Sequence, residues 1–227
     1  MSRSILAGAV AAPILLSLSA GCATVSTAQP SLRPDGSIIG APRSNRGFEA
    51  ISESELALLK KSVLFTEEDA RYLRMSKAVL SPHLDELLGV WYGFVGANEH
   101  LLYYFSSPST GDPQPEYLAR VRERFGRWVL ETADADFDQA WLNRQLEIGL
   151  RHHRIAKNTT DDADAAAHIP LRYMIALYYP VTATMEPFLA RGGHSEEDVR
   201  KMHAAWEKAV LMSAILWVQP YTPPRDF

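Results

Sequence analysis

From Gly47 onward, apolar residues recur at spacings of three and four positions, which is the period of an amphipathic α-helix. Two stripes show the pattern clearly: Tyr117, Val121, Phe125 and Trp128, and later Val199, Met202, Trp206, Val210 and Trp217. No run that alternates with the period of a β-strand stands outside these helical stretches. The pattern predicts an all-α fold of about seven to eight helices.

Local signals mark where several helices begin and end. A hydroxyl residue followed three positions later by an acidic residue is typical of a helix start; such pairs occur at Ser52 and Glu55, Thr66 and Asp69, and Ser195 and Asp198. Residues 106–115 are rich in Pro, Ser and Gly and predict a loop. Further helices are expected from about Leu84 and over 136–154, followed by a polar loop to Ala167. Another is expected over 170–190, which Pro180 should kink by removing a backbone donor.

The first residues differ from the rest of the chain. Residues 1–21 carry one arginine and a short apolar run ending in small residues, as in a secretory signal. Cys22 follows a segment similar to a bacterial lipobox, and Ala23 after it resembles outer-membrane sorting. We therefore expect lipidation of Cys22, a flexible tether over 22–46 and one domain over 47–227. The protein would sit at the periplasmic face of a membrane by its lipid anchor alone; a signal cleaved nearby, leaving a secreted or periplasmic protein, is the alternative.

The composition narrows the function classes. The chain has 227 residues, is 47% hydrophobic and has a formal net charge of −4. Its interleaved acidic and basic residues argue against nucleic acid as a partner. A single cysteine excludes an internal disulfide, multi-cysteine zinc sites and iron–sulfur clusters. No sequence motif of a metalloprotease, a serine hydrolase or a nucleotide-binding loop is present.

The pair His152–His153 is the most distinctive candidate for chemistry. An imidazole is a common metal ligand. Cationic side chains in the last turn of a helix also complement its dipole, so a purely structural role stays open. Helical periodicity does not choose between the two histidines. Gly149, one turn earlier, would let a flat macrocycle approach the backbone.

Other polar and aromatic residues carry a structural interpretation first. Trp91, Tyr92 and Phe125 have the spacing of core aromatics. For the run 101–105, packing in the core is the first interpretation and lining a pocket is the second. Asp161 lies in an Asp-rich stretch that lacks the pattern of a calcium loop, so a solvated connector is expected.

From Arg46 to Phe227 the chain resembles a protoglobin, the single-domain relative of the sensor domains of globin-coupled sensors. The resemblance lies in motifs that occur in order along the chain: WYGFVG at 91–96, HLLYYFSSP at 100–108, RF at 124–125, RW at 127–128, DQAWL at 138–142, EIGLRHHR at 147–154, YPVTATM at 179–185 and PFLAR at 187–191. It implies a globin-like three-over-three helical sandwich with an additional N-terminal helix.

The resemblance also implies haem b (iron protoporphyrin IX) and a set of residues around it. His152 matches the proximal iron ligand and Tyr92 the distal hydrogen-bond donor, with Trp91 and Phe125 beside it. Other positions match porphyrin contacts or channel walls: Phe105, Val121, Met174 and Leu177, the last standing where phenylalanine is expected. Arg124 is a candidate partner for a haem propionate.

The function that follows is reversible binding of a diatomic gas (dioxygen, carbon monoxide or nitric oxide), as carrier or sensor. The last two helices resemble the family's dimer interface, so a homodimer is expected, with an unidentified signalling partner or electron donor. Two alternatives stay open. One is a haem-dependent redox enzyme acting on nitric oxide or peroxide, and the other is a non-haem helical adaptor tethered to a membrane.

Overall fold

The computed structural model describes residues 47–227, which contain nine α-helical segments. Most connections are short, and the two longest lie over 103–114 and 153–170. Their bounds are α1 Glu53–Ser62, α2 Glu67–Leu80, α3 Leu84–Gly96, α4 Glu99–Leu102, α5 Pro115–Asp134, α6 Gln139–His152, α7 Leu171–Ala176, α8 Tyr178–Leu189 and α9 Glu196–Trp217. The all-α prediction is confirmed. The expected signal, the lipidated Cys22 and the tether lie outside the described residues.

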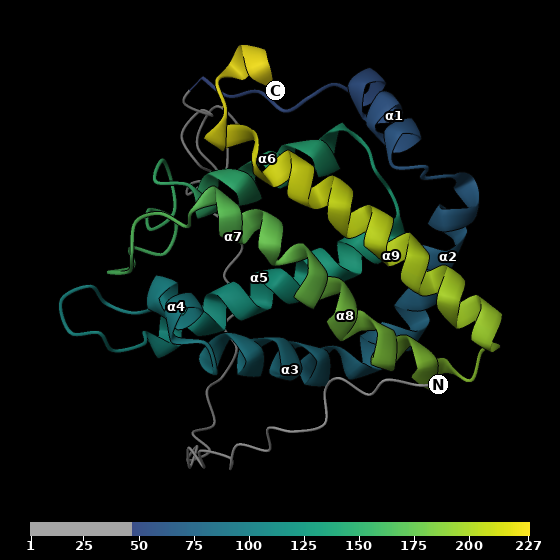
Figure 1. Cartoon of the computed structure of the whole chain (residues 1–227), viewed down its shortest axis with the longest axis horizontal. Coiled ribbons are helices and arrows are strands. Elements are labelled where there is room, and N and C mark those ends of the chain that lie inside the picture. Colours follow the sequence, from purple (N-terminus) through teal and green to yellow (C-terminus); the bar gives the residue numbers. More distant parts are fainter. Residues whose placement is uncertain (1–46) are drawn as a thin grey trace, which may run out of the picture. The chain divides into compact units, whose positions relative to one another are not determined.

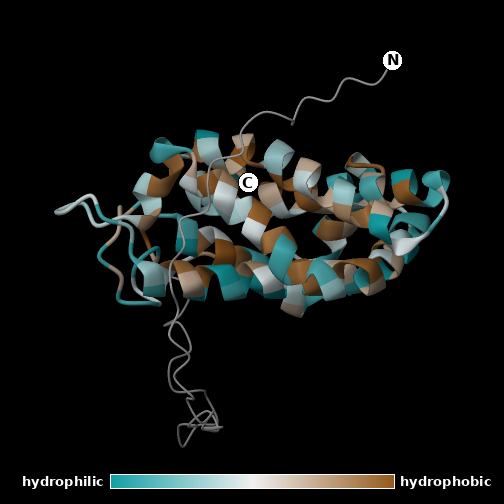
Figure 2. Ribbon diagram, turned by 90° about the horizontal axis from the view of Figure 1, so that it is seen from below, coloured by the Kyte–Doolittle hydropathy of each residue, from teal (hydrophilic) through white to brown (hydrophobic). Residues whose placement is uncertain are grey.

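The helices pack in two layers around an apolar core. Helix α9 packs against α8 and crosses α2 and α6, while α2 also packs against α5, and α3 packs against both α5 and α8 (Figure 1). Hydrophobic residues gather between the layers, whereas hydrophilic ones cover much of the outside (Figure 2). No helix within residues 47–227 is both long enough and apolar enough to cross a membrane.

The predicted helix starts at 52, 66 and 195 are confirmed. Ser52 and Thr66 each accept a hydrogen bond from the backbone N–H three residues on. The carboxylates of Glu55 and Asp69 in turn accept from the backbone N–H of Ser52 and Thr66, which completes two capping boxes. Ser195 caps α9 in the same way through the N–H of Asp198. These contacts stabilise each helix start by about 0.5–2 kcal/mol.

The helix predicted over 170–190 is broken in two. The break falls between Ala176 and Tyr178, one turn before Pro180, which lies in the first turn of α8. A proline ring clashes with the carbonyl four residues earlier and supplies no donor, so the helix restarts where the first-turn N–H groups need no partner. The proline therefore ends one helix and begins another, rather than bending a continuous one.

Gly149 allows α9 to pack closely on α6. A Cβ atom there would lie 2.6 Å from the backbone oxygen of Trp217. The expected role of Gly149, close approach of a macrocycle, is therefore not what the fold shows: the neighbour is the end of α9.

Gly149→Ala is expected to destabilise the apoprotein by about 1–3 kcal/mol because the added methyl group meets backbone. The matched control is Gly89→Ala in α3, where nothing lies within 4 Å of the added Cβ. That change should stabilise the folded protein by up to about 1 kcal/mol, because alanine lowers the conformational entropy of the unfolded chain. Urea unfolding of both variants measures the difference, and equal effects would contradict the packing argument.

Candidate functional site

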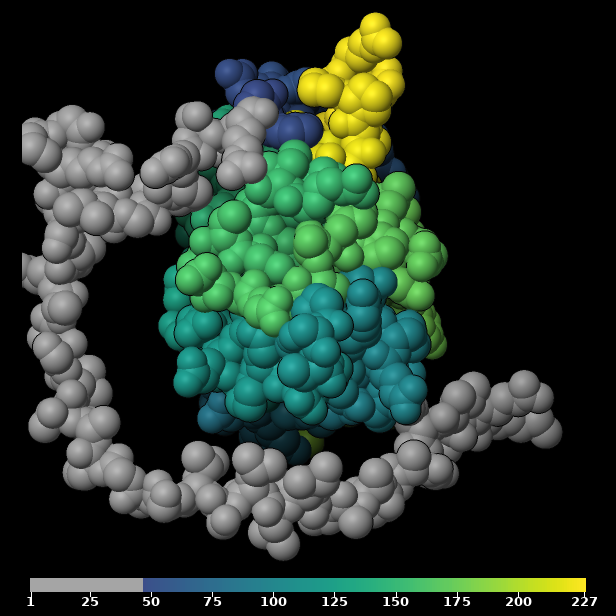
Figure 3. Space-filling view, turned by 90° about the vertical axis from the view of Figure 1, so that its left-hand side faces the viewer, coloured from purple at the N-terminus to yellow at the C-terminus, as the bar shows by residue number. Residues whose placement is uncertain are grey.

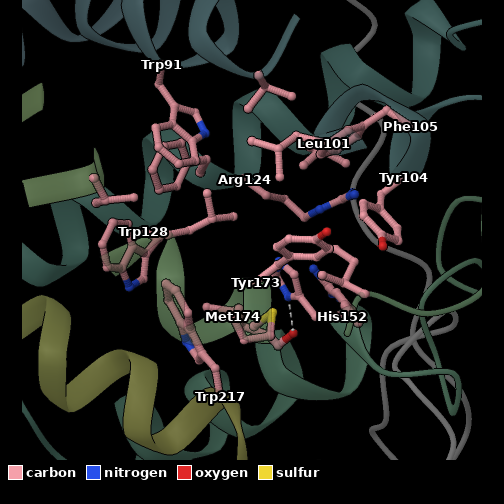
Figure 4. A pocket seen from close by; sticks show the side chains of 18 of the residues that line it. Trp91, Leu101, Tyr104, Phe105, Arg124, Trp128, His152, Tyr173, Met174 and Trp217 are labelled. Atoms are coloured by element: carbon pink, nitrogen blue, oxygen red, sulfur yellow. Dashed lines mark hydrogen bonds between the residues drawn. The ribbon is translucent and has the colours of Figure 1, made fainter. Parts of the chain in front are cut away.

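One large cavity lies between α5 and α6, closed on its other sides by α3, α7, α8 and α9. Its empty volume is about 1300 Å³, counting the part open to solvent, and its walls are mostly aromatic and aliphatic. All nine residues that the sequence placed around a cofactor line it: Trp91, Tyr92, Phe105, Val121, Arg124, Phe125, His152, Met174 and Leu177. Trp91 and Phe105 come from one side of the cavity and His152 and Met174 from the other (Figure 4). Their roles toward a cofactor stay predictions.

His152 is the last residue of α6 and lines this cavity. Its Nδ1 lies 2.7 Å from the backbone oxygen of Ile148, one turn earlier (Figure 4). A carbonyl oxygen can only accept, so Nδ1 carries the proton and Nε2 keeps a lone pair. Burial lowers the pKa of His152 to about 4, and the nearby cations add to this effect. The imidazole is therefore neutral at physiological pH, the form that ligates metals.

Trp217 fixes the plane of the His152 ring. The two rings are stacked, with centroids 6.1 Å apart and planes 11° apart. The indole is held in turn by its Nε1–H, which donates to Oε1 of Gln145 at 2.8 Å. The end of α9 thus holds the imidazole in place through Trp217. The close packing of α9 on α6 at this point depends on Gly149.

His153 lies outside the cavity. Its backbone is already extended, with φ −90° and ψ 153°, because α6 has ended. Its ring packs instead against His168 and Tyr221, with centroids 5.0 Å and 4.9 Å away. The structure thus separates the two histidines that periodicity could not distinguish.

The α3 wall carries Tyr92 and Trp91. The Tyr92 ring packs edge-on against Phe105 and Phe125, each with its centroid 6.5 Å away. Within residues 47–227 its hydroxyl makes no hydrogen bond to another side chain or to the backbone. Burial raises the pKa of this phenol above its usual range, so it stays a donor at any physiological pH. Trp91 is buried and packs on Phe125 at 5.7 Å.

Arg124 reaches the cavity from α5 and is paired with Asp161. Its guanidinium donates to both carboxylate oxygens, with Nη1 at 3.0 Å from Oδ1, and Arg120 adds a further contact at 3.1 Å. The Asp161 side chain is only 4% exposed. The expectation that Asp161 belongs to a solvated connector is therefore wrong. Arg120 and Arg124 of α5 pair with Asp161 and hold the segment after α6 against the cavity.

The comparisons with known proteins identify the family of the chain. The model of the protoglobin family matches residues 52–226. The chain belongs to the protoglobin family. Globins bind diatomic gases at haem, so this protoglobin is a globin-type gas-binding haem protein.

A solved structure shows the same fold. The globin domain of the Geobacter sulfurreducens globin-coupled sensor superposes on this protoglobin with a TM-score of 0.56 at 14% sequence identity. The match covers 74% of this chain and 98% of that one, and at this identity it supports the fold alone. No curated protein sequence matches the chain.

The residues present in the protoglobin's cavity suit a haem. The cavity offers a broad apolar space, a neutral histidine with a free Nε2 lone pair and a phenol donor. Polar atoms without a partner also lie there: the Nε of Arg151 is buried and makes no hydrogen bond within the described part of the chain. An anionic, largely apolar ligand would satisfy both kinds of wall.

Sequence reasoning missed Lys157, which also lines the cavity and is 3% exposed. Its Nζ donates to the backbone oxygen of Tyr104 at 2.8 Å. A lysine in a polar loop gives no sequence signal for burial, because lysine side chains are almost always solvated.

Proposed function

We propose that the cavity holds haem b, with iron ligated by Nε2 of His152, and that the protein binds a diatomic gas reversibly as carrier or sensor. The observation that carries the proposal is the Nδ1 hydrogen bond to Ile148, which fixes the tautomer that leaves Nε2 free. When bound, haem supplies the iron at which dioxygen, carbon monoxide or nitric oxide coordinates.

Side chains that line the cavity would then set the relative affinity for each gas. The Tyr92 hydroxyl, protonated and without a protein partner in the described residues, is available to donate to a polar gas ligand. In a low-dielectric cavity such a bond is stronger than in water. Trp91, Phe125 and Val95 line the same wall and exclude water from it.

An absorption spectrum tests the proposal most directly. Purified protein supplemented with haem should show a Soret band, a five-coordinate ferrous form and a shift of that band when carbon monoxide is added. A protein that shows no Soret band after supplementation overturns the proposal and favours the non-haem adaptor.

We also propose export with lipidation at Cys22, supported by the sequence of residues 1–22, and a homodimer through α8 and α9, where Tyr179 and Leu211 are exposed. Mass analysis of the exported protein's N-terminus and sedimentation of the purified chain test these two proposals.

A further inference from the structure

One end of the cavity is unusually rich in positive charge. Arg124, Arg151 and Lys157 line it together with a single carboxylate, Asp161. The segment between α6 and α7 supplies Lys157 and Asp161, and it meets the segment around α4 on one face of the domain (Figure 3).

Two of the three cations already have carboxylate partners. Arg124 is paired with Asp161, and Arg151 with Glu147 one turn earlier on α6. Among residues 47–227, Lys157 forms no ion pair. It donates instead to neutral oxygens: the carbonyl of Tyr104 at 2.8 Å and, more weakly, the Tyr117 hydroxyl at 3.5 Å and the Asn158 side chain at 3.4 Å.

An ammonium group buried without an opposite charge lowers the stability of the apoprotein. Charged side chains are rarely buried unless an opposite charge accompanies them. Burial lowers the pKa of Lys157 to about 8, so the group is still mostly protonated at neutral pH. A charge retained here at a cost to stability is typical of a binding site rather than of a core.

The position of Lys157 fits a ligand with two carboxylates. Tyr117, which it contacts, lies on α5 two helical turns before Arg124. Asp161, which Arg124 holds, lies four residues after Lys157. Lys157 and Arg124 therefore line the same end of an otherwise largely apolar cavity.

We propose that Lys157 binds a carboxylate of the cavity's ligand, one propionate of haem, while Arg124 serves the other. This inference rests on the proposed function, because it takes haem as the ligand. The unpartnered Nε of Arg151 is a further donor at this end. The bond would be a charge-assisted one in a site largely shielded from water.

The test compares haemin with its dimethyl ester, whose two carboxylates are blocked. Each is loaded into the apoprotein, and its release is followed as transfer to excess apomyoglobin. Lys157→Met should release haemin about tenfold faster or more while changing ester release by less than about twofold. Lys61→Met, the same change at an exposed position at the end of α1, should change neither rate.

A second measurement separates binding from folding. Removing an unpaired buried charge should raise the melting temperature of the apoprotein even as haemin release becomes faster. If Lys157→Met does not fold, Lys157→Gln, which keeps a donor to Tyr104 but no charge, is used in the same comparison. Lys157→Arg should restore slow release in part.

The outcomes distinguish the role of Lys157 from the binding of haem itself. If Lys157→Met and Lys157→Gln release haemin and its ester with the wild-type ratio, the carboxylate role of Lys157 is wrong although haem still binds. If the wild-type protein binds neither compound with a Soret band, the proposed function itself fails.

Discussion

His152→Ala is expected to lose the five-coordinate haem spectrum and to release haem at least about a hundredfold faster than the wild-type protein. The reason is that no other imidazole lines the cavity among the described residues, so nothing replaces Nε2. Losing only the outer partners of a metal ligand already costs about 10–100-fold in affinity. Absorption spectra and haem transfer to apomyoglobin measure both effects.

Two controls make this result specific. His153→Ala should keep the spectrum, because the ring of His153 packs against His168 and Tyr221 outside the cavity. In His152→Gly, added imidazole should restore the five-coordinate spectrum by occupying the vacated space. If His153→Ala loses haem and His152→Ala keeps it, the assignment of the ligand is wrong.

Tyr92→Phe is expected to speed dioxygen release about tenfold. The hydroxyl would otherwise donate to the polar gas in a water-poor cavity, and such a bond is worth on the order of 1–2 kcal/mol. Carbon monoxide accepts hydrogen bonds poorly, so its release should change little. Laser-flash or stopped-flow kinetics on the ferrous protein give both rates.

The matched control removes a hydroxyl elsewhere in the same cavity. Tyr104 also lines the cavity, and it is the backbone of Tyr104, not its side chain, that accepts from Lys157. Tyr104→Phe should therefore leave both release rates unchanged. Equal acceleration of the two gases in Tyr92→Phe would show that the phenol acts by filling space and not by donating.

Much of the helical framework could be predicted because its signals are local. A cap such as Ser52 with Glu55 bonds to groups within one turn, so the four residues alone specify it. The stripe from Tyr117 to Trp128 needs only the helical period, and its members all line the cavity. The break before α8 could be predicted less well, because the clash of Pro180 falls one turn away from the proline itself.

What the sequence by itself determined was most of the helices, the apolar face of each and the family to which they point. Only the tertiary structure decided which residues meet a ligand. His152 and His153 are neighbours with the same chemistry, yet one lines the cavity and the other packs outside it because α6 ends between them. Lys157 and Asp161 stand in a polar stretch that looks solvated, and contacts from α5 and the segment before it bury them. Burial depends on residues distant in the chain, so no local pattern of charge or hydropathy predicts it.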